Sequence, residues 1–444
     1  MDPSRRDVLL AGLALQVAAF LPRSARAEAE RPSPEEVMAT WYRLVLELVR
    51  HTPTYSPPVA SRAFAYLGIS VYEALAQGKA PMVSLAGQLH SLKPVPAAVD
   101  PLAECDEAVL LHSVFADAVR IFFSNTGPTG QRAMKAMTDR LGAKVAAGLS
   151  PEVVERSAAQ GRAVVDHIVA WSQDDGGAVI ENMGFPLDYE PSRDPGHWRP
   201  TSTIAQQQAP LLPNWGTNRP FAMPSPTACT LPPPPAYSEE KGTEFYAEAL
   251  EVYETVRNLT PEQTAIARFW SDDPMLSTTP PGHWNQIALE QLEIENAPAR
   301  RRAEVMARLG ITVADAFIAC WQSKYEYDLV RPVTYIKKVI DKTWEPLLIT
   351  PPFPEYPSGH STQSGAAARV LTAIWGNNFA FTDTSHEDDG LPSRSYPSFW
   401  AAADEAGISR LYGGIHFRSA IDRGLEQGRC VGAFAVALKM GAQA

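Results

Sequence analysis

Helix starts with proline at the first helical position recur along this chain, and signals for β-strands are almost absent. Ser33-Pro34-Glu35-Glu36 and Thr260-Pro261-Glu262-Gln263 are capping boxes, and Ser150-Pro151 is a third helix start. Apolar residues then recur at helical spacing after such starts. The chain is therefore predicted to be all-α, built from packed helix bundles. Helical patterns are expected near residues 34–48, 60–76, 104–123, 131–147, 151–171, 261–270, 283–295, 298–327, 358–375, 399–411 and 417–440.

The helical pattern disappears between about Gln173 and Tyr237, where prolines are frequent. A connection of this length inside a compact protein is usually functional or wraps the body of the fold. Trp198, Trp215 and Phe221 argue against a solvated linker. We expect an ordered arm packed across the helices. The predicted organisation is a signal peptide (residues 1–27), an N-terminal helical half (28–175), a Pro-rich arm (176–237) and a C-terminal helical half (238–444).

The formal net charge of the chain is −11, which argues against a nucleic-acid partner. The N-terminus has Arg5-Arg6, an apolar stretch to about Leu21, and Ala25-Arg26-Ala27. Twin arginines, an apolar core and an A-x-A site predict a twin-arginine export signal cut after Ala27, and hence a periplasmic or secreted protein. No other stretch is long and apolar enough to predict a membrane span.

The four cysteines, Cys105, Cys229, Cys320 and Cys430, lack CxxC spacing, so a zinc or redox motif is not predicted. An exported protein can form disulfides. Three of the four, however, lie in helical patterns, where a buried thiol is the commoner role. The sequence leaves their disulfide status open.

Three segments in the last third of the chain carry the donors that a tetrahedral oxyanion needs. In the first, Lys324 and Arg331 are seven positions apart, two helical turns if the helix continues. Pro332 pushes Arg331 towards extended geometry, so we expect Lys324 at a helix end and Arg331 on the turn beyond it. Lysine supplies a point charge and arginine a bidentate fork. Taken alone, the pair fits a solvated helix surface better.

The second segment, Pro357-Ser358-Gly359-His360, precedes an apolar helix. Unpaired N–H groups and the helix dipole at such a start favour an anion. Gly359 permits close approach of the backbone, Ser358 adds a hydroxyl, and His360 can carry a proton. A simple N-cap would explain Ser358 but neither of the other two residues.

The third segment has Arg410 at the end of one predicted helix, Gly413-Gly414 as a break, and His416 at the start of the next. A histidine at such a turn can aim a ring nitrogen at a central atom. The alternative for His416 is a buried, hydrogen-bonded structural histidine.

Together the segments form the signature K-x6-RP, PSGH and SR-x5-H, which resembles the vanadium-dependent haloperoxidases and the related type-2 phosphatidic acid phosphatases. The segments 269–273 and 279–286 look like the haloperoxidase branch, as do Ser56–Ala63 and the aromatic residues of the arm. The resemblance covers most of the chain after residue 27. It implies two packed four-helix bundles with vanadate as cofactor, and no haem or flavin.

The resemblance also implies residue roles. His416 would be the axial vanadium ligand, and His360 would be the acid–base group. Asp273 would pair with an anion-site arginine, Arg410, and Trp321 and Phe353 would line the halide side. The vanadate oxygens would be bound by Lys324, Arg331, Ser358, Gly359 and Arg410.

One position departs from the phosphatase pattern, which has an acid four residues after the second histidine. Here that position is Ala420, and Asp422 lies on another helical face, so the group that fixes the His416 tautomer is not evident. The first hypothesis is a vanadate-dependent haloperoxidase that oxidises halide with hydrogen peroxide to a hypohalous acid equivalent, which halogenates a small organic substrate. The alternatives are an acid phosphatase, with His416 as nucleophile and His360 as general acid, and a non-catalytic oxyanion-binding protein. The halide preference, the organic substrate and the oligomeric state, including a homo-oligomer, stay open.

Overall fold

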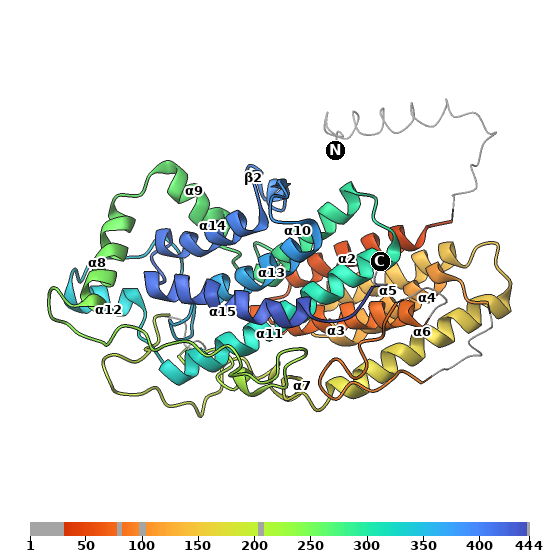
Figure 1. Cartoon of the computed structure of the whole chain (residues 1–444), viewed down its shortest axis with the longest axis horizontal. Coiled ribbons are helices and arrows are strands. Elements are labelled where there is room, and N and C mark those ends of the chain that lie inside the picture. Colours follow the sequence, from red (N-terminus) through yellow and green to blue (C-terminus); the bar gives the residue numbers. More distant parts are fainter. Residues whose placement is uncertain (1–30, 78–81, 97–103, 203–207, 442–444) are drawn as a thin grey trace, which may run out of the picture. The chain divides into compact units, whose positions relative to one another are not determined.

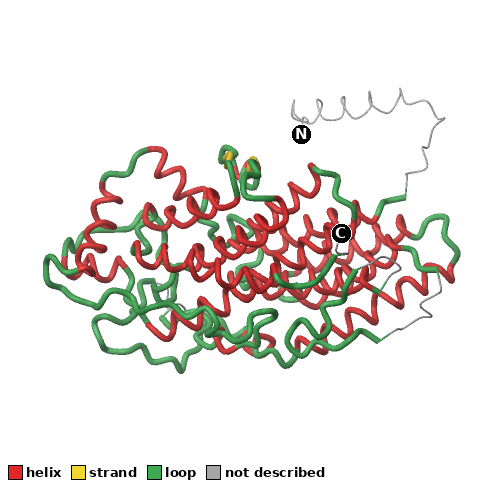
Figure 2. The backbone as a smooth tube through the Cα atoms, in the orientation of Figure 1, coloured by secondary structure: helices red, strands yellow, loops and turns green. Residues whose placement is uncertain are grey.

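Three helices, starting at Pro34, Pro151 and Pro261, begin at the residues that the capping signals predicted. The computed structural model describes residues 31–77, 82–96, 104–202 and 208–441, and the predicted signal peptide lies outside these ranges. In both capping boxes the cap hydroxyl accepts from the third helical N–H, and the Glu36 and Gln263 side chains accept from the cap N–H. The described chain is mostly helical, which confirms the all-α prediction (Figure 2).

The N-terminal part of the described chain contains α2 (Pro34–Arg50), α3 (Pro57–Ala76), α4 (Glu107–Phe122), α5 (Pro128–Val145) and α6 (Pro151–Ser172). The C-terminal part contains α8 (Glu244–Arg257), α9 (Pro261–Phe269), α10 (Thr279–Ile294), α11 (Ala299–Tyr327), α12 (Pro332–Val339), α13 (Gly359–Trp375), α14 (Phe399–Tyr412) and α15 (Arg418–Val436). Short elements are α7 (Gly177–Ile180), η2 (Trp215–Thr217), η3 (Glu387–Asp389), β1 (Phe381–Asp383) and β2 (Arg394–Tyr396).

The long helix α11 connects two groups of packed helices (Figure 1). It has 29 residues, so it is about 43 Å long at 1.5 Å per residue. One group is α2, α3, α4 and α6, and α11 contacts it chiefly through α3. The other consists of α11 itself with α13, α14 and α15. Because α11 packs in both groups, the described residues from Ser33 onwards form one compact unit, and the predicted boundaries of the two helical halves stay predictions.

Glycines allow the closest helix contacts around α11 and α13. A Cβ atom on Gly428 of α15 would lie 2.0 Å from the Thr362 carbonyl oxygen of α13, and one on Gly68 of α3 would lie 2.9 Å from the Ala307 Cα of α11. These backbones therefore approach more closely than any larger residue permits. The close packing fixes the start of α13, where three of the predicted site residues lie.

The Pro-rich arm is ordered over its described residues and packs on the helices, as predicted. Trp198, Trp215 and Phe221 are all buried. The buried carboxylate of Asp315 in α11 accepts hydrogen bonds from the N–H groups of residues 221, 222 and 223. Burial raises the Asp315 pKa to about 6 against the effect of these donors. The arm is therefore attached to the central helix by its backbone.

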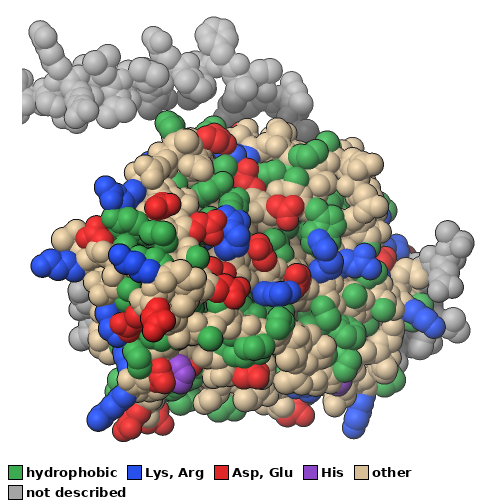
Figure 3. Space-filling model, turned by 60° about the vertical axis from the view of Figure 1, so that its left-hand side comes forward, with side chains coloured by type: hydrophobic (Ala, Val, Ile, Leu, Met, Phe, Trp, Pro, Cys, Tyr) green, Lys and Arg blue, Asp and Glu red, His purple; other side chains and the backbone are tan. Residues whose placement is uncertain are grey.

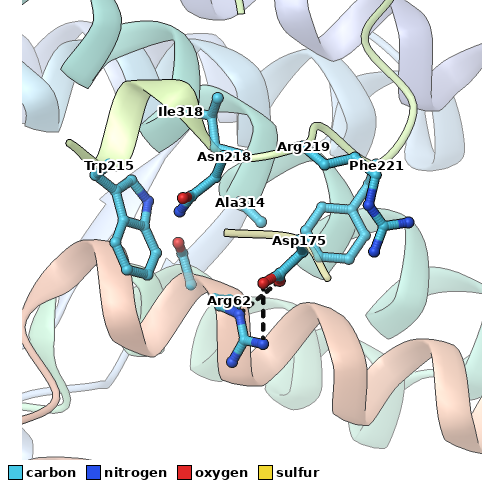
Figure 4. A pocket seen from close by; sticks show the side chains of 9 residues that line it. Arg62, Asp175, Trp215, Asn218, Arg219, Phe221, Ala314 and Ile318 are labelled. Atoms are coloured by element: carbon cyan, nitrogen blue, oxygen red, sulfur yellow. Dashed lines mark hydrogen bonds and ion pairs between the residues drawn. The ribbon is translucent and has the colours of Figure 1, made fainter. Parts of the chain in front are cut away.

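The start of the arm is held by a buried ion pair on α3. Arg62 donates to Asp175 at 2.7 Å and to Glu181 at 2.7 Å. A small pocket lies beside this pair, between α3, α11 and the arm, and Trp215 and Asn218 also line it (Figure 4). None of the predicted oxyanion residues lines this pocket. The match of Ser56–Ala63 to the haloperoxidase branch thus includes an arginine that anchors the arm.

The far end of the arm is joined covalently to α15. Cys229 and Cys430 form a disulfide with 6.0 Å between their Cα atoms, while Cys105 and Cys320 are free thiols. The bridge closes a loop between residues 201 positions apart. Helical periodicity could not reveal this pairing, because the partner of Cys430 lies in the irregular arm.

Charged side chains of both signs are interspersed over the face in Figure 3. Among the described helices, none combines the length and the apolar character that crossing a bilayer requires. The short antiparallel pair β1–β2, with Phe381 opposite Tyr396, adds the one described sheet to the helical body. Its strand β1 ends at the buried Asp383.

Candidate active site

Lys324 lies in the last turn of α11 and is completely buried. Its ammonium group donates to the carbonyl oxygens of Pro354, Glu355 and Pro357, at 2.9, 3.0 and 2.5 Å. Burial lowers the pKa of Lys324 to about 7. Lys324 therefore holds the segment 354–357 in place and supplies positive charge, but its three N–H groups already have backbone partners.

Arg331 is the residue before α12, in the extended conformation that Pro332 imposes. Its Nε donates to the Phe353 carbonyl at 2.8 Å, and its Nη1 donates to the Ile415 carbonyl at 2.9 Å. Nη2 is buried and has no hydrogen-bond partner in the described structure. Burial lowers the Arg331 pKa to about 10. This guanidinium is thus fixed by two carbonyls with one donor group left for a ligand.

His416 lies two residues before α15 and contacts both Arg331 and Glu355. Its Nε2 is 3.1 Å from Arg331 Nη1, and its Nδ1 is 2.8 Å from Oε1 of Glu355. Arginine can only donate, so Nε2 accepts and Nδ1 carries the proton that it donates to Glu355. Burial and the charges of Arg331, Lys324, Arg410 and His360 hold the pKa of His416 well below its ordinary value. The neutral ring presents its Nε2 lone pair to the cationic side chains.

Glu355 is the orienting group for His416 that the sequence analysis did not identify. Its Oε1 also accepts from the Phe417 N–H at 2.8 Å, while Oε2 is buried without a partner. Burial raises the Glu355 pKa to about 8, although the charges of Arg331 and Lys324 oppose that shift. Ala420 at the expected acidic position is therefore compensated by a carboxyl group from another segment. Glu355 could have been predicted from its position directly before the Tyr356-Pro357-Ser358 segment.

The N-terminus of α13 presents Ser358, Gly359 and His360 together. Ser358 is the N-cap, and its hydroxyl oxygen accepts from the Ser361 N–H. The N–H groups of Gly359 and His360 have no partner within the helix, as is general for the first helical turn. A Cβ atom on Gly359 would meet its nearest neighbour, Trp321, at 3.7 Å, an ordinary contact distance. Protein packing therefore does not require glycine here.

His360 is the least buried of the predicted donors, with 17% of its side chain exposed. Its Nε2 lies 3.6 Å from Asp272 Oδ2 and has no hydrogen-bond partner. Burial and the charge of Arg410 lower the His360 pKa to about 4, so the ring is neutral near pH 7. A bound anion would oppose both effects and raise this pKa.

Arg410 is buried in the last turn of α14, where Nη2 donates to the Trp270 carbonyl and Nε donates to the Ser409 hydroxyl. The expected ion pair with Asp273 is not formed within 4.0 Å among the described side chains. Arg410 lowers the Asp273 pKa through its charge, but burial outweighs this and raises that pKa. Asp272, whose charge acts on Arg410 as well, is the acidic residue of this segment that contacts histidines.

The two aromatic residues assigned to the halide side lie together beside the cations. The rings of Trp321 and Phe353 are 4.9 Å apart, and Trp321 Nε1 donates to the Leu211 carbonyl of the arm. Lys324 Nζ and Arg331 Cζ lie 5.1 and 5.0 Å from the centre of the Phe353 ring. The arm and these rings form an apolar wall on one side of the predicted donors.

A second group of buried histidines lies behind His360. His283 of α10 contacts Asp272 through Nδ1 at 3.0 Å and Asp383 through Nε2 at 2.8 Å. His386 contacts Asp272 through Nε2 at 3.4 Å and Asp389 through Nδ1 at 2.9 Å. We call Asp272, His283, His386 and Asp383 the carboxylate–imidazole cluster.

The structure thus gathers the predicted donors from distant parts of the chain. His416 contacts Arg331 directly, and the charges of Lys324, Arg410 and His360 act on it. Arg331 Nη2 is buried without a partner, the N–H groups of Gly359 and His360 have no partner within α13, and the three buried cations Lys324, Arg331 and Arg410 add positive charge. This chemistry fits a tetrahedral oxyanion with one nitrogen ligand, such as vanadate. The predicted roles of the individual residues stay predictions.

Comparisons with known proteins agree with this geometry. A family model for the second helical-bundle domain of VCPO matches residues 304–442. The crystal structure of the first bacterial vanadium-dependent iodoperoxidase is 38% identical, with a TM-score of 0.84 over 92% of this chain and 97% of that one. The holo-type bacterial vanadium-dependent chloroperoxidase has the same fold, with a TM-score of 0.66 over 91% of this chain and 95% of that one, at 17% identity.

A vanadium chloroperoxidase from Curvularia inaequalis is 25% identical in an alignment of 224 positions, and the match covers 36% of this chain and 36% of that protein. The aligned part thus spans about a third of that relative. The chain belongs to the vanadium-dependent haloperoxidase family, because the iodoperoxidase likeness extends over nearly the whole of both chains.

Proposed function

We propose that this protein is a vanadate-dependent haloperoxidase, which uses hydrogen peroxide to oxidise halide to a hypohalous acid equivalent that halogenates a small organic substrate. The observation that carries the proposal is the geometry of His416. Its Nδ1 proton is donated to Glu355, so the Nε2 lone pair is directed at Arg331 in a pocket of excess positive charge. A lone pair held in this way can bond to the central atom of an oxyanion whose oxygens the cations neutralise.

Vanadate, when bound, would supply a Lewis-acidic centre that activates hydrogen peroxide towards halide without a change in the metal's oxidation state. Arg331 would donate through its free Nη2, and Ser358 and the Gly359 N–H would donate from the helix start. Lys324 and Arg410 would contribute charge. Each hydrogen bond to a charged group is worth about 1.5–3 kcal/mol, so several such donors can hold the anion.

His360 would move the proton. Its ring is neutral near pH 7, so it could accept a proton from hydrogen peroxide and later donate one to the oxygen that leaves as water. The ring is also the donor with access to solvent. Halide would approach along the apolar wall of Trp321 and Phe353, where nearby cations offset its charge.

A specific observation keeps acid phosphatase chemistry as a second candidate. Nucleophilic catalysis by His416 needs a carboxyl group on its other ring nitrogen, and Glu355 occupies that place at 2.8 Å. The absence of an acid at position 420 therefore no longer argues against a phosphohistidine. His360 would then protonate the leaving group.

Two assays distinguish these activities. Protein freed of oxyanions should halogenate a diketone dye only after orthovanadate is added, and inorganic phosphate should compete with the vanadate. The haloperoxidase proposal is rejected if the protein stays inert with vanadate, peroxide and chloride, bromide or iodide. Efficient hydrolysis of p-nitrophenyl phosphate by the same preparation would then establish the phosphatase.

We also propose that the protein is exported by the twin-arginine pathway to the periplasm or the medium. Arg5-Arg6 and the Ala25-Arg26-Ala27 site support this, and they lie outside the described residues. The Cys229–Cys430 disulfide agrees with an oxidising compartment. Replacing both arginines by lysine should trap the precursor in the cytoplasm, and unchanged export of that variant would contradict the proposal.

A further inference from the structure

The carboxylate–imidazole cluster is assembled from three separate segments around one carboxylate. Asp272 follows α9, His283 projects from α10, and His386 follows strand β1. Oδ1 of Asp272 is 3.0 Å from His283 Nδ1 and 3.4 Å from His386 Nε2. All three ligand atoms lie within 4.8 Å of one another. Two imidazoles and a carboxylate oxygen therefore converge on one small volume.

The outer nitrogens of both rings are bound to carboxylates. His283 Nε2 is 2.8 Å from Asp383, and His386 Nδ1 is 2.9 Å from Asp389. A neutral ring that donates its one proton outwards directs a lone pair inwards, at the Asp272 oxygen. Two lone pairs facing a carboxylate repel it unless a cation lies between them. Either each ring carries an extra proton in the interior, or one metal ion replaces those protons.

The arrangement matches the way proteins support metal-binding histidines. Such a histidine usually donates its other N–H to a carboxylate or carbonyl, which fixes the tautomer and the ring orientation. Both His283 and His386 have this support. His386 Nε2 is unpartnered in a residue that is only 5% exposed, and it is aimed at Asp272. Ligand atoms of a tetrahedral zinc ion lie about 3.3 Å apart, close to the two separations at Asp272.

Aromatic rings surround the cluster, and the negative charge of its carboxylates matches the charge of a divalent cation. Trp270 stacks on His283 with ring centres 4.5 Å apart, and Phe269 contacts the edge of His386 at 5.1 Å. Asp272 and Asp383 supply two negative charges, and Arg50 pairs with Asp389. A divalent cation between the three ligands would leave this buried group with no net charge.

We propose that Asp272, His283 and His386 bind one divalent first-row transition metal, zinc being the expected ion, in a site separate from the oxyanion pocket. Two nitrogens and one oxygen at this spacing suit zinc better than calcium or magnesium, which prefer oxygen ligands. His360 faces the other oxygen of Asp272 at 3.6 Å. The metal would thus fix the carboxylate that lies behind the proton-carrying histidine.

Metal content of the full chain tests the proposal without any assay of halogenation. Protein stripped with chelator and dialysed against micromolar zinc should retain one zinc per chain by elemental analysis. Cobalt in place of zinc should give the visible absorption of a site with nitrogen and oxygen ligands. No vanadate is present, so the result does not depend on the proposed function.

Variants test which residues bind the metal. His386→Gln and Asp272→Asn should each lower zinc affinity at least tenfold. His51→Gln, a change of an exposed histidine, and His416→Ala, a change in the oxyanion pocket, should leave it unchanged. Wild-type protein that retains less than about a tenth of a zinc per chain overturns the proposal. So does zinc that is lost in His416→Ala but kept in His386→Gln. Since the wild-type measurement needs no variant, misfolding of Asp272→Asn leaves the test intact.

Discussion

His416 and His283 are almost completely buried, yet their environments shift their pKa values in opposite directions. The His416 pKa is held well below its ordinary value, and that of His283 is raised to about 10. Burial lowers both. At His283 the charges of Asp272 and Asp383 outweigh burial, whereas at His416 Arg331 and Lys324 add to it.

The difference identifies which region lacks a counter-ion. In the carboxylate–imidazole cluster without a metal ion, a protonated His283 has a carboxylate on each ring nitrogen and a protonated His386 has one on Nδ1. In the oxyanion pocket, Lys324, Arg331 and Arg410 are buried, and burial lowers the pKa of each. A region that keeps unbalanced charge away from water is prepared for a ligand of opposite sign. His360 lies between the two regions.

The largest expected effect is at His360. His360→Ala should lower the turnover number by about 10²–10⁴-fold, the usual contribution of a general acid–base group. Vanadate affinity should stay within a few fold of the wild-type value. Steady-state kinetics and equilibrium dialysis measure the two quantities. If turnover survives, proton transfer does not depend on this ring, and His360 belongs to the cluster rather than to the pocket.

Substitutions of Glu355 test whether vanadate binding depends on the orientation of His416 or on the negative charge of the Glu355 carboxylate. Glu355→Leu removes the acceptor of the Nδ1 proton and should weaken vanadate binding by about 10–100-fold. Glu355→Gln keeps an oxygen acceptor and removes the charge, so its effect should be smaller. Isothermal titration calorimetry compares the two variants. Equal losses in both would mean that charge, not orientation, is the contribution of Glu355.

Lys324 should make the stability of the ligand-free protein depend on pH. Its pKa falls from 10.5 in the unfolded chain to about 7 in the folded protein, so between these values the unfolded state binds more protons. The free energy of unfolding should therefore rise with pH, by about 1.4 kcal/mol per unit from this group. The measurement is urea unfolding at pH 7.5 and 9.

Other groups also titrate in this range, so the comparison is with Lys324→Met under the same conditions. The variant should lack the slope that belongs to Lys324, and its stability relative to wild type should fall as pH rises. Parallel stability curves for the two proteins would show that Lys324 is not the group whose pKa is lowered.

The smallest effect is expected at Gly359. Since a Cβ atom there meets protein atoms only at ordinary distance, Gly359→Ala should change the free energy of unfolding by about 0.5 kcal/mol or less. Phosphate affinity should fall by about 1 kcal/mol if the anion approaches this backbone. Gly127→Ala, at an open position before α5, is the control. Unchanged phosphate affinity would remove Gly359 from the binding site.

The helical body could be predicted from sequence because its signals are local. Capping boxes and proline positions act within one turn, so the starts of α2, α6 and α9 agree with the structure. Helix α12 was not predicted, since its eight residues are too few to show a clear period. The ends of α15 were placed too widely, because apolar residues continue beyond Val436.

The donors of the candidate site could be predicted because each lies beside a helix end with its own short motif. The side chains that contact these donors could not be predicted. Glu355 and His416 are 61 positions apart, and His283 and Asp383 are 100 positions apart. Such pairs depend on how helices pack, which no local pattern records. The same holds for Asp272, which contacts three histidines although the sequence analysis gave a role only to its neighbour Asp273.

Seven consecutive residues, 354–360, carry an unusual share of the chemistry. Three of their carbonyl groups accept hydrogen bonds from Lys324, the Glu355 side chain orients the His416 imidazole, and His360 provides a second imidazole. A change in the length of the loop before this stretch would therefore displace both histidines at once.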